Sequence, residues 1–552
     1  MRRGVAAFSV MLCCAWTAQA QEGHHHELTE QEVGSVHFGT SCAEGMNEAA
    51  RAEFDASFNK AVALLHSFQY EDTRRAFEAI AKKNPQCAMA EWGVAMSHYH
   101  GLWRSGDLAA GRAAIQKARE IANSTATSAR EKAYIEVLAD LYAEDKTDYV
   151  MRGAAFEKKL GEVAGAYPTD TEAQIFHALA LKVSASPLDK TFSNEKKCGE
   201  ILEPIFKQHP HHPGVAHYII HCYDNPVLAE QGLGAARMYA KIAPVSAHAN
   251  HMPSHIFTRV GSWEESIASN IRSAEIAASQ ERDSKNGEAR DQRLHAMDYL
   301  EYAYLQTGQV KQAKAVLDEF EGFQPVPGLT LTGNYAVGAI PARYTIELRQ
   351  WKEASELKPM ADGVPWARAL VWEAIGEGSA RAGNLERAKE AELKLAELRD
   401  EAAKSNSYWS KQIEVQRREV NAWIADQGGR KEEAIAGMRA AAELEESMDK
   451  DAVTPGAVTP AREMLAHMLS AEQRDKEALR EYEAVLKVAP KRFNALYGAA
   501  VAANRSGNDA ASVIYFRELT ELAKRKERPE VETARTKLVE MAQKKTAATQ
   551  KQ

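Results

Sequence analysis

Two pairs of histidines repeat along this chain at a fixed spacing. His217 and His221 are followed, 34 residues later, by His251 and His255. A four-residue separation places both imidazoles of a pair on one face of a helix, and 34 residues is the length of a two-helix structural repeat. Both pairs are therefore predicted to occupy equivalent positions in consecutive repeats. Grouped neutral imidazoles suit Zn, Cu, Fe or Ni rather than Mg or Ca.

Other polar side chains fall into the same register when the repeats are aligned on their turns. Three shared slots result, filled by His217, His251 and Asp298, by His221, His255 and Tyr302, and by His248 and His295. All are predicted to lie on the first helix of a repeat, and therefore on the concave groove of the array, where neighbouring helices stand about 8 to 10 Å apart. The two repeated pairs are the predicted metal ligands, and the other residues are further metal or groove candidates.

Pro253 lies between His251 and His255 and is predicted to start or kink a helix at that point. If the helix starts there, His251 belongs to the preceding loop.

The elements that must position these residues are helices. From about residue 49 the chain is rich in Ala, Leu, Glu, Lys and Arg, with apolar residues at three- and four-residue steps. Glycine turns separate amphipathic stretches in RVGSW, QTGQV, RAGNL and RSGND, at residues 259–263, 306–310, 381–385 and 505–509. The pattern predicts an all-α array of helical hairpins.

Small, apolar and proline positions recur at offsets that resemble the tetratricopeptide (TPR) family. They are Ala466, Leu469, Ala478, Tyr482 and Pro490 in one repeat, Leu496, Ala500, Gly507 and Phe516 in the next, and Ala61, Leu64, Phe77 and Pro85 near the start. The resemblance covers roughly residues 49–540 and implies a right-handed superhelical solenoid whose concave groove binds a protein or peptide. The chain is also similar to exported bacterial TPR proteins of unassigned function that share an HFGTSC-like start and an HMPSHIF-like centre.

The N-terminus has the pattern of a secretory signal. Arg2 and Arg3 precede an apolar run, and Ala18 and Ala20 form a small-x-small cleavage site, which predicts a cut after Ala20 and a periplasmic or secreted product. The remaining divisions are a flexible arm (21–48), His-rich repeats (49–322), a break rich in Pro and Gly (323–342), C-terminal repeats (343–540) and a disordered tail (541–552).

Four cysteines follow the signal: Cys42, Cys87, Cys198 and Cys222. In an oxidising compartment they allow up to two disulfides in three connectivities, of which we favour Cys42 with Cys87. Cys222 is adjacent to His221 and offers a thiolate as an alternative metal ligand.

Composition excludes several function classes. The chain has 552 residues, 45% hydrophobic and 26% charged, with a formal net charge of -8. This predicts several domains or an extended array, with no basic region that would recruit nucleic acid. After the signal, no apolar stretch is long enough for a membrane span. The chain has no Gly-rich phosphate loop, nucleophile elbow or H-E-x-x-H motif.

Two functions remain in competition. We favour an exported scaffold that binds a protein or peptide partner without turnover, because TPR arrays bind partners more often than they catalyse. The alternative is a transition-metal-binding protein or metal-dependent enzyme that uses the histidines of residues 209–255, with His295 or Asp298. A helical toroid hydrolase is a third candidate, disfavoured by the offsets of Pro85 and Pro490. The oligomeric state stays open.

Overall fold

The structure, a computed structural model, describes residues 28–146, 148–283, 287–451 and 454–549. The helices of the N-terminal half are α1 (Glu30–Val33), α2 (Glu48–His66), α3 (Tyr70–Lys83), α4 (Ala88–Ser97), α5 (Leu108–Ser124), α6 (Ala129–Leu141), α7 (Tyr149–Ala166), α8 (Thr171–Ser184), α9 (Ser193–Gln208), α10 (Pro213–Tyr223), α11 (Leu233–Ile242), α12 (Ala247–His251), α13 (Pro253–Arg259), α14 (Trp263–Asp283), α15 (Glu288–Gln306) and α16 (Val310–Glu321). Those of the C-terminal half are α17 (Leu331–Glu347), α18 (Trp351–Ser355), α19 (Pro365–Arg381), α20 (Leu385–Ala403), α21 (Ser407–Gln427), α22 (Lys431–Glu446), α23 (Ala461–Ala471), α24 (Asp475–Val488), α25 (Phe493–Arg505), α26 (Asp509–Leu522) and α27 (Pro529–Thr549). Short 3-10 helices and one antiparallel strand pair complete the described elements: η1 (Ser41–Ala43), η2 (Gly101–Trp103), η3 (Ala229–Gly232), β1 (Tyr99–His100) and β2 (Ser105–Gly106).

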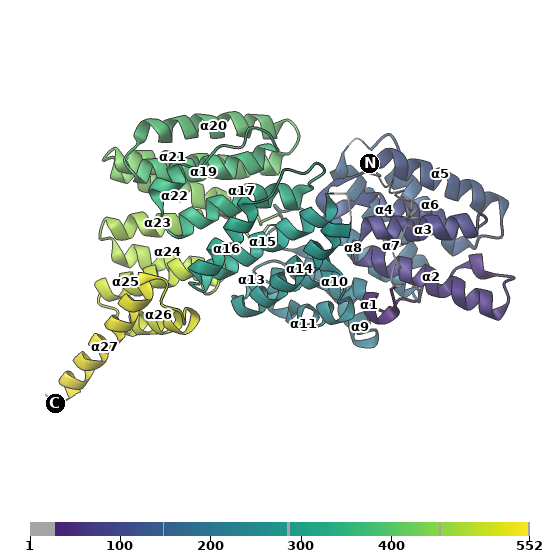
Figure 1. The fold of residues 1–552 in the computed structure, drawn as a ribbon, viewed down its shortest axis with the longest axis horizontal. Helices are drawn as coiled ribbons and strands as arrows, with labels where there is room; N and C mark the ends of the chain where they lie inside the picture. Colours follow the sequence, from purple (N-terminus) through teal and green to yellow (C-terminus); the bar gives the residue numbers. More distant parts are fainter. Residues whose placement is uncertain (1–27, 147, 284–286, 452–453, 550–552) are drawn as a thin grey trace, which may run out of the picture.

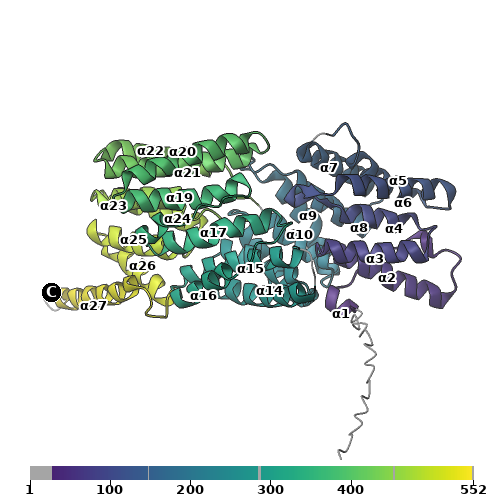
Figure 2. The same ribbon diagram turned by 45° about the horizontal axis from the view of Figure 1, so that its top comes forward.

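Helical hairpins stack side by side along the molecule. Figures 1 and 2 show α2 to α8 at one end, α19 to α27 at the other and α10 to α17 between them. The largest apolar core runs through the N-terminal hairpins, a second fills the C-terminal hairpins, and a smaller one joins α15, α16 and α17. The predicted all-α superhelical solenoid is confirmed.

Each predicted glycine turn ends a helix in the left-handed region of backbone space. Gly261, Gly308, Gly383 and Gly507 have φ values of 68°, 68°, 85° and 81°. Only glycine adopts this conformation without a steric cost, so it stops one helix and turns the chain into the next.

The small positions of the repeats have a packing reason. On α24, the buried residues Ala478, Leu479, Tyr482 and Val485 share one face. Gly498 of α25 lies against the ring of Tyr482, and a Cβ atom there would come within 2.2 Å of it. The small residue therefore lets neighbouring helices approach closely enough to bury the large one.

Residues 28–48 are packed against the array, so the prediction of a flexible arm is wrong for this stretch. Phe38 is buried, with its ring centroid 5.3 Å from that of Tyr134. The carboxylate of Glu131 on α6 accepts hydrogen bonds from Thr40 Oγ1 and Ser41 N at 2.5 and 2.8 Å. Apolar burial and a shared carboxylate fix the segment.

The predicted break at 323–342 is also wrong in its second half, because α17 begins at Leu331. The two glycines of α17, Gly333 and Gly338, serve close packing instead of turning the chain. A Cβ atom on Gly338 would lie 2.3 Å from the carbonyl oxygen of Ala367. At the C-terminus α27 continues to Thr549, so residues 541–549 are helical instead of disordered.

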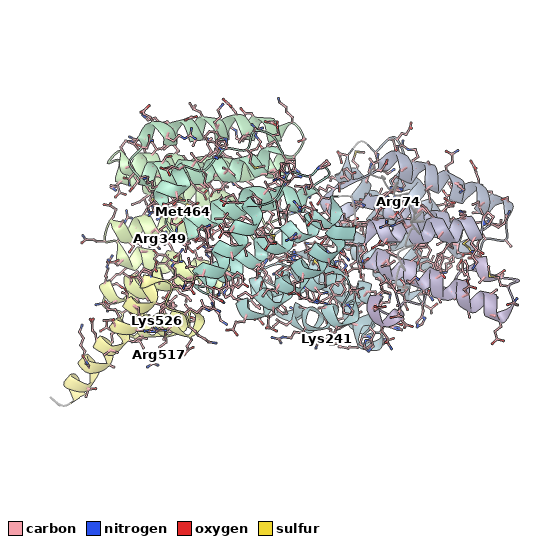
Figure 3. All side chains as sticks on the ribbon, viewed as in Figure 1. Arg74, Lys241, Arg349, Met464, Arg517 and Lys526 are labelled. Carbon is pink, nitrogen blue, oxygen red and sulfur yellow. A yellow bond between two sulfur atoms is a disulfide. The ribbon has the colours of Figure 1, made fainter. Side chains whose placement is uncertain are left out.

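The predicted signal peptide, its cleavage site after Ala20 and the histidines at 24–26 lie outside the described residues. No helix in the described ranges is both long and apolar enough to cross a membrane. Charged side chains cover both halves, as Figure 3 shows with Arg74 and Lys241 in one half and Arg349, Arg517 and Lys526 in the other.

Candidate metal centres

Two consecutive first helices carry the repeated histidines: α10, and α12 continued by α13. His217 and His221 lie on α10, His248 and His251 on α12, and His255 on α13. Pro213 starts α10, where its missing N–H costs nothing. These elements present the side chains inward, to the packed core of the array.

Pro253 starts α13, yet His251 remains helical. His251 is the last residue of α12, and Met252 between the two helices keeps right-handed helical angles, with φ -53° and ψ -36°. The proline removes a backbone donor without turning the chain away. His251 and His255 therefore keep the four-residue helical spacing that brings their rings together.

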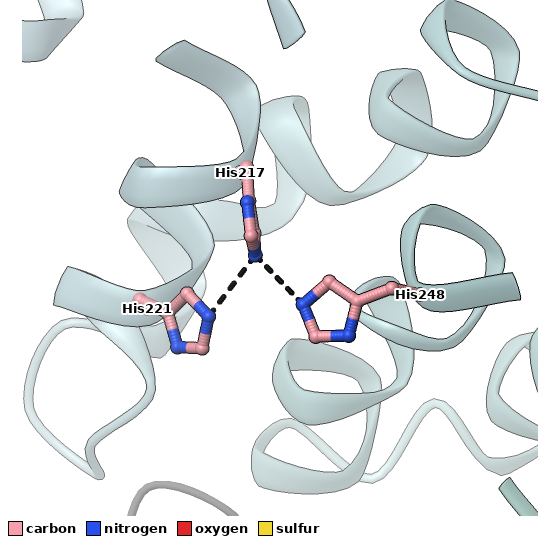
Figure 4. Close-up of side chains that lie close together, drawn as sticks. All are labelled: His217, His221 and His248. Carbon is pink, nitrogen blue, oxygen red and sulfur yellow. Dashed lines mark hydrogen bonds between the residues drawn. The ribbon is translucent and has the colours of Figure 1, made fainter. Parts of the chain in front are cut away.

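The first group, which we call triad A, consists of His217, His221 and His248. The Nε2 atom of His217 lies 3.1 Å from Nε2 of His221 and 2.9 Å from Nε2 of His248 (Figure 4). All three side chains are buried. Three imidazole nitrogens thus converge on one point inside the protein.

The second group, triad B, consists of His251, His255 and His295. The Nε2 atoms of His251 and His255 are 3.0 Å apart. His295 comes from α15, and its ring centroid lies 4.1 Å from that of His251. In each triad, one potential ligand atom per residue lies within 4.8 Å of the others.

Each triad follows one rule of construction. A first helix supplies two histidines four residues apart, and the first helix of the next hairpin supplies the third. The triads are neighbours, because the ring centroids of His221 and His255 are 6.2 Å apart.

Hydrogen bonds from the opposite ring nitrogens set the tautomers. His217 Nδ1–H donates to the carbonyl oxygen of His66 at 2.6 Å. His251 Nδ1–H donates to Asn270 Oδ1 at 2.7 Å, and the Asn270 orientation is fixed because its amide nitrogen donates to the Ser266 carbonyl at 2.8 Å. Partners of this kind orient metal-binding histidines and raise their basicity.

His255 has the same arrangement with a carboxylate partner. Its Nδ1–H donates to Asp224 Oδ2 at 2.9 Å, and Tyr299 OH lies 3.3 Å from the same nitrogen. Burial would raise the pKa of Asp224, but Lys450 and Arg259 hold it well below its ordinary value. Asp224 is therefore an anion that can only accept hydrogen bonds. His255 is neutral and donates from Nδ1, so its Nε2 lone pair points at the Nε2 lone pair of His251.

The triad histidines are held neutral. Burial lowers the pKa of every one of them, and repulsion by neighbouring imidazoles adds to the effect. For His255, hydrogen bonding to Asp224 opposes the effect of burial without cancelling it. Neutral imidazole is the form that binds metal.

A third group, His66 with Glu172 and His212, has a full set of hydrogen bonds without any ion. Glu172 accepts from Nε2–H of both histidines at 2.9 Å. Tyr218 OH donates to His66 Nδ1 at 2.9 Å, and the backbone N–H of Val215 donates to His212 Nδ1 at 3.3 Å. We assign this His66 network to structure, because it buttresses the carbonyl of His66 that orients His217.

Asp298 and Tyr302, the candidates that shared slots with the repeated histidines, do not join the triads. Asp298 forms a buried ion pair with Arg343, and Tyr302 accepts a hydrogen bond from Arg492 at 2.8 Å. They occupy on α15 the positions that His251 and His255 occupy one hairpin earlier. There α17 supplies the guanidinium of Arg343 in place of a third histidine.

Two other expectations need correction. The histidines were expected on an open concave groove, but all six are at most 4% exposed, so a peptide in a groove could not reach them. Cys222 forms a disulfide with Cys198 and offers no thiolate. The second disulfide joins Cys42 to Cys87, the pairing that the sequence analysis favoured.

The sequence analysis missed Asp224 and Asn270, the side chains that orient triad B. Asn270 had a recognisable signal: Ser266, Asn270 and Ser273 recur at helical spacing on α14, and all three are buried. A buried polar stripe on a second helix indicates hydrogen-bond partners on the helix beside it. Asp224 follows the end of α10, and its partner Lys450 lies 226 residues away, beyond the reach of local patterns.

Comparisons with known proteins add little to this geometry. No protein-family model matches the chain, and no curated protein sequence matches it. Among solved structures, a human IFIT1 dimer with m7Gppp-AAAA is 12% identical, with a TM-score of 0.34, 79% of this chain covered and 90% of that chain. Yeast Tom70 is also 12% identical, with a TM-score of 0.26, 89% of this chain covered and 96% of that chain. Scores this low carry no argument about the site.

Proposed function

We propose that this protein binds two first-row transition-metal ions, one in each histidine triad. The observation that carries the proposal is the contact between Nε2 of His251 and Nε2 of His255 at 3.0 Å, with both Nδ1 protons committed to acceptors. Two lone pairs facing each other inside a protein repel, and burial opposes a second proton on either ring. A metal ion removes the repulsion by accepting both lone pairs.

The donor set favours particular metals. Three imidazoles without a bound carboxylate suit Zn, Cu, Fe or Ni. Bonds of about 2.1 Å in a tetrahedral site place ligand nitrogens about 3.4 Å apart. The three pairs at 2.9 to 3.1 Å need only shifts of a few tenths of an ångström, and the other pairs of each triad lie within 4.8 Å. Three protein ligands leave a fourth position for water or another small ligand.

A scaffold role for the array would have to use another surface, since the histidines are buried. Recognition of a protein or peptide partner stays a prediction. Export is part of the proposal, and the two disulfides support it because they suit an oxidising compartment.

The test is the metal content of the mature chain, untagged and without histidines 24–26, purified from the periplasmic fraction without chelators. We expect about two equivalents of Zn, Cu, Fe or Ni per chain, and a melting temperature that falls when a chelator removes them. Finding the chain in that fraction, beginning at Gln21, tests export in the same preparation.

Paired variants separate the two triads. His217→Gln with His221→Gln, and His251→Gln with His255→Gln, should each keep about one equivalent. His467→Gln is the matched control, because this partly buried histidine lies 3.1 Å from Arg349 and belongs to neither triad. Two results would overturn the proposal. One is metal-free protein whose melting temperature does not change when metal is added, and the other is paired variants with unchanged metal content.

A further inference from the structure

A second site candidate lies where the C-terminal hairpins face α13; Thr258 and Arg259 of that helix belong to its wall, and no triad histidine does. A cavity of about 660 Å³ opens between α19, α21, α22 and the stretch 454–460. Its volume lies in the range of small-molecule sites. Unlike the histidine centres, it has space for an organic ligand.

Two buried carboxylates line this cavity without a direct ion pair. Glu373 and Glu419 are 4% and 3% exposed, and neither forms an ion pair with any described residue. Glu373 accepts a hydrogen bond from Gln416, and the charge of Arg343 opposes the rise of its pKa without cancelling it. The charges near Glu419 that raise its pKa, beyond burial itself, are those of Glu373, Glu445 and Glu377, all of the same sign. Burying carboxylates together is costly unless a cation joins them.

Several other buried acids are paired with a cation. Glu377, one turn from Glu373 on α19, binds Arg381 at 3.0 Å. Glu347 and Glu463 share the buried guanidinium of Arg492. Glu301 on α15 is also buried without an ion pair to any described residue, but it does not line the cavity. Glu373 and Glu419 differ from it because they border a space that can hold a ligand.

Aromatic rings form a further part of the cavity wall. Trp366 and Trp409 stack with ring centroids 5.5 Å apart, and the ring centroids of Tyr408 and Trp409 are 5.1 Å apart. The faces of such rings attract cations. Leu370, Ile413 and Val458 add an apolar lining.

On another part of the wall, charged residues pair with one another. Lys450 donates to Asp224 at 2.6 Å, and Arg259 contacts both Asp224 and Asp449. Lys190 donates to the carbonyl oxygen of Met448 at 3.1 Å, and Lys487 is exposed to solvent. A cationic ligand is therefore directed to Glu373 and Glu419. Glu445 stands near both and accepts a hydrogen bond from the backbone N–H of Ala461 at 2.9 Å.

We propose that this cavity binds an aliphatic di- or polyamine. The carboxylates require more than one positive charge, the tryptophans bind ammonium groups through their faces, and the apolar lining suits the methylene chain between the charges. The inference goes beyond metal binding and does not depend on it.

Calorimetry with 1,8-diaminooctane and spermidine tests the proposal, with 1,8-octanediol as the neutral probe of the same chain length. The full mature chain is used, both as purified and after chelator treatment. We expect both amines to bind in both preparations and the diol to bind at least tenfold more weakly. Binding should strengthen from pH 6 to pH 8, because burial raises the pKa of Glu445 to about 7 and raises those of Glu373 and Glu419 too.

The decisive variant is Glu373→Gln with Glu419→Gln. It removes two buried charges and should fold, and we expect it to weaken diamine binding at least tenfold. The control is Glu386→Gln with Glu443→Gln, two exposed residues on α20 and α22, which should stay within twofold of the parent chain. Any of three results would overturn the proposal: equal binding of diol and diamine, diamine binding that the double variant does not weaken, or no binding of either amine.

Discussion

At the scale of single residues, a histidine placed to bind metal differs from an ordinary buried histidine in which ring nitrogen carries the proton and where that N–H points. In the His66 network every ring nitrogen has a complementary partner. In triad B both Nδ1 protons point outward to acceptors, and the Nε2 atoms face each other. Only the second arrangement calls for a cation.

Removing the acceptor behind one ligand should therefore weaken one site. In Asn270→Ala the His251 ring loses its 2.7 Å hydrogen bond and can turn or change tautomer. We expect triad B to bind metal about 10- to 100-fold more weakly, with triad A unchanged, in a titration against a chromophoric chelator. Asn334→Ala, which removes an amide bonded only to backbone carbonyls, serves as the control. Equal weakening of both triads would contradict the role given to Asn270.

The sequence predicted both histidine pairs and the slot shared by His248 and His295, because helical spacing and repeat length are local properties. It did not predict burial. A repeat pattern identifies the first helices but not how closely neighbouring helices pack, so residues assigned to an open groove lie inside the core.

At the scale of elements, the stretch before α2 is an integral part of the array. Burial raises the pKa of Glu131, but hydrogen bonds from Ser41, Thr40 and Ser128 outweigh it and leave the pKa below its ordinary value. The carboxylate is thus charged and fully used as an acceptor. Together with the disulfide of Cys42 to Cys87, it fixes this stretch to α4 and α6.

Loss of that acceptor should open the stretch locally. We expect Glu131→Ala to cost about 3 kcal/mol of local stability, because charged hydrogen bonds are lost and buried donors are left unpaired. That cost corresponds to about 100-fold faster proteolysis of residues 28–45 in the open-state limit. Glu136→Ala on the same helix breaks only an exposed pair with Arg119 and should change the rate little. Similar cleavage rates for the two variants would rule out this anchoring role.

Turns and helices were predictable because each glycine turn is encoded within five residues. The error at 323–342 has a related cause: glycines that permit close contact, such as Gly338 against Ala367, look the same in sequence as glycines that turn the chain. Only the tertiary neighbour distinguishes them.

At the scale of the whole molecule, charged contacts join the two halves in addition to the apolar core of α15, α16 and α17. Asp224 from the N-terminal half accepts from His255 and from Lys450 of the C-terminal half, which lines the cavity. A single carboxylate therefore contacts both a triad ligand and a residue of the cavity wall. The long sequence separation explains why neither the contact nor the cavity was predicted.

The uncompensated cavity acids should make the stability of the amine-free chain depend on pH. Burial and mutual repulsion raise the pKa values of Glu373 and Glu419. Acids with raised pKa values in the folded state contribute stability that is fully present below their ordinary pKa of about 4.5 and is lost as pH rises through the folded value.

Glu373→Gln with Glu419→Gln should therefore raise the melting temperature at pH 8 by on the order of 3 °C, with little change at pH 5. Thermal melts across this range check it, with Glu386→Gln and Glu443→Gln as the pair expected to melt like the parent chain. A double variant with the same pH slope as the parent chain would show that the acids do not carry this cost.

The ion pair of Asp298 with Arg343 takes the place of a third histidine triad in the series of repeats. At each of three successive positions, two side chains from one hairpin meet one from the next: the two triads, and then Asp298 and Tyr302 with Arg343. In the proposed loaded state, the first two positions hold exchangeable cations, and the third holds a covalently attached one, the guanidinium of Arg343. Under this proposal the permanent charge of Arg343 ends the series and limits the chain to two metal ions.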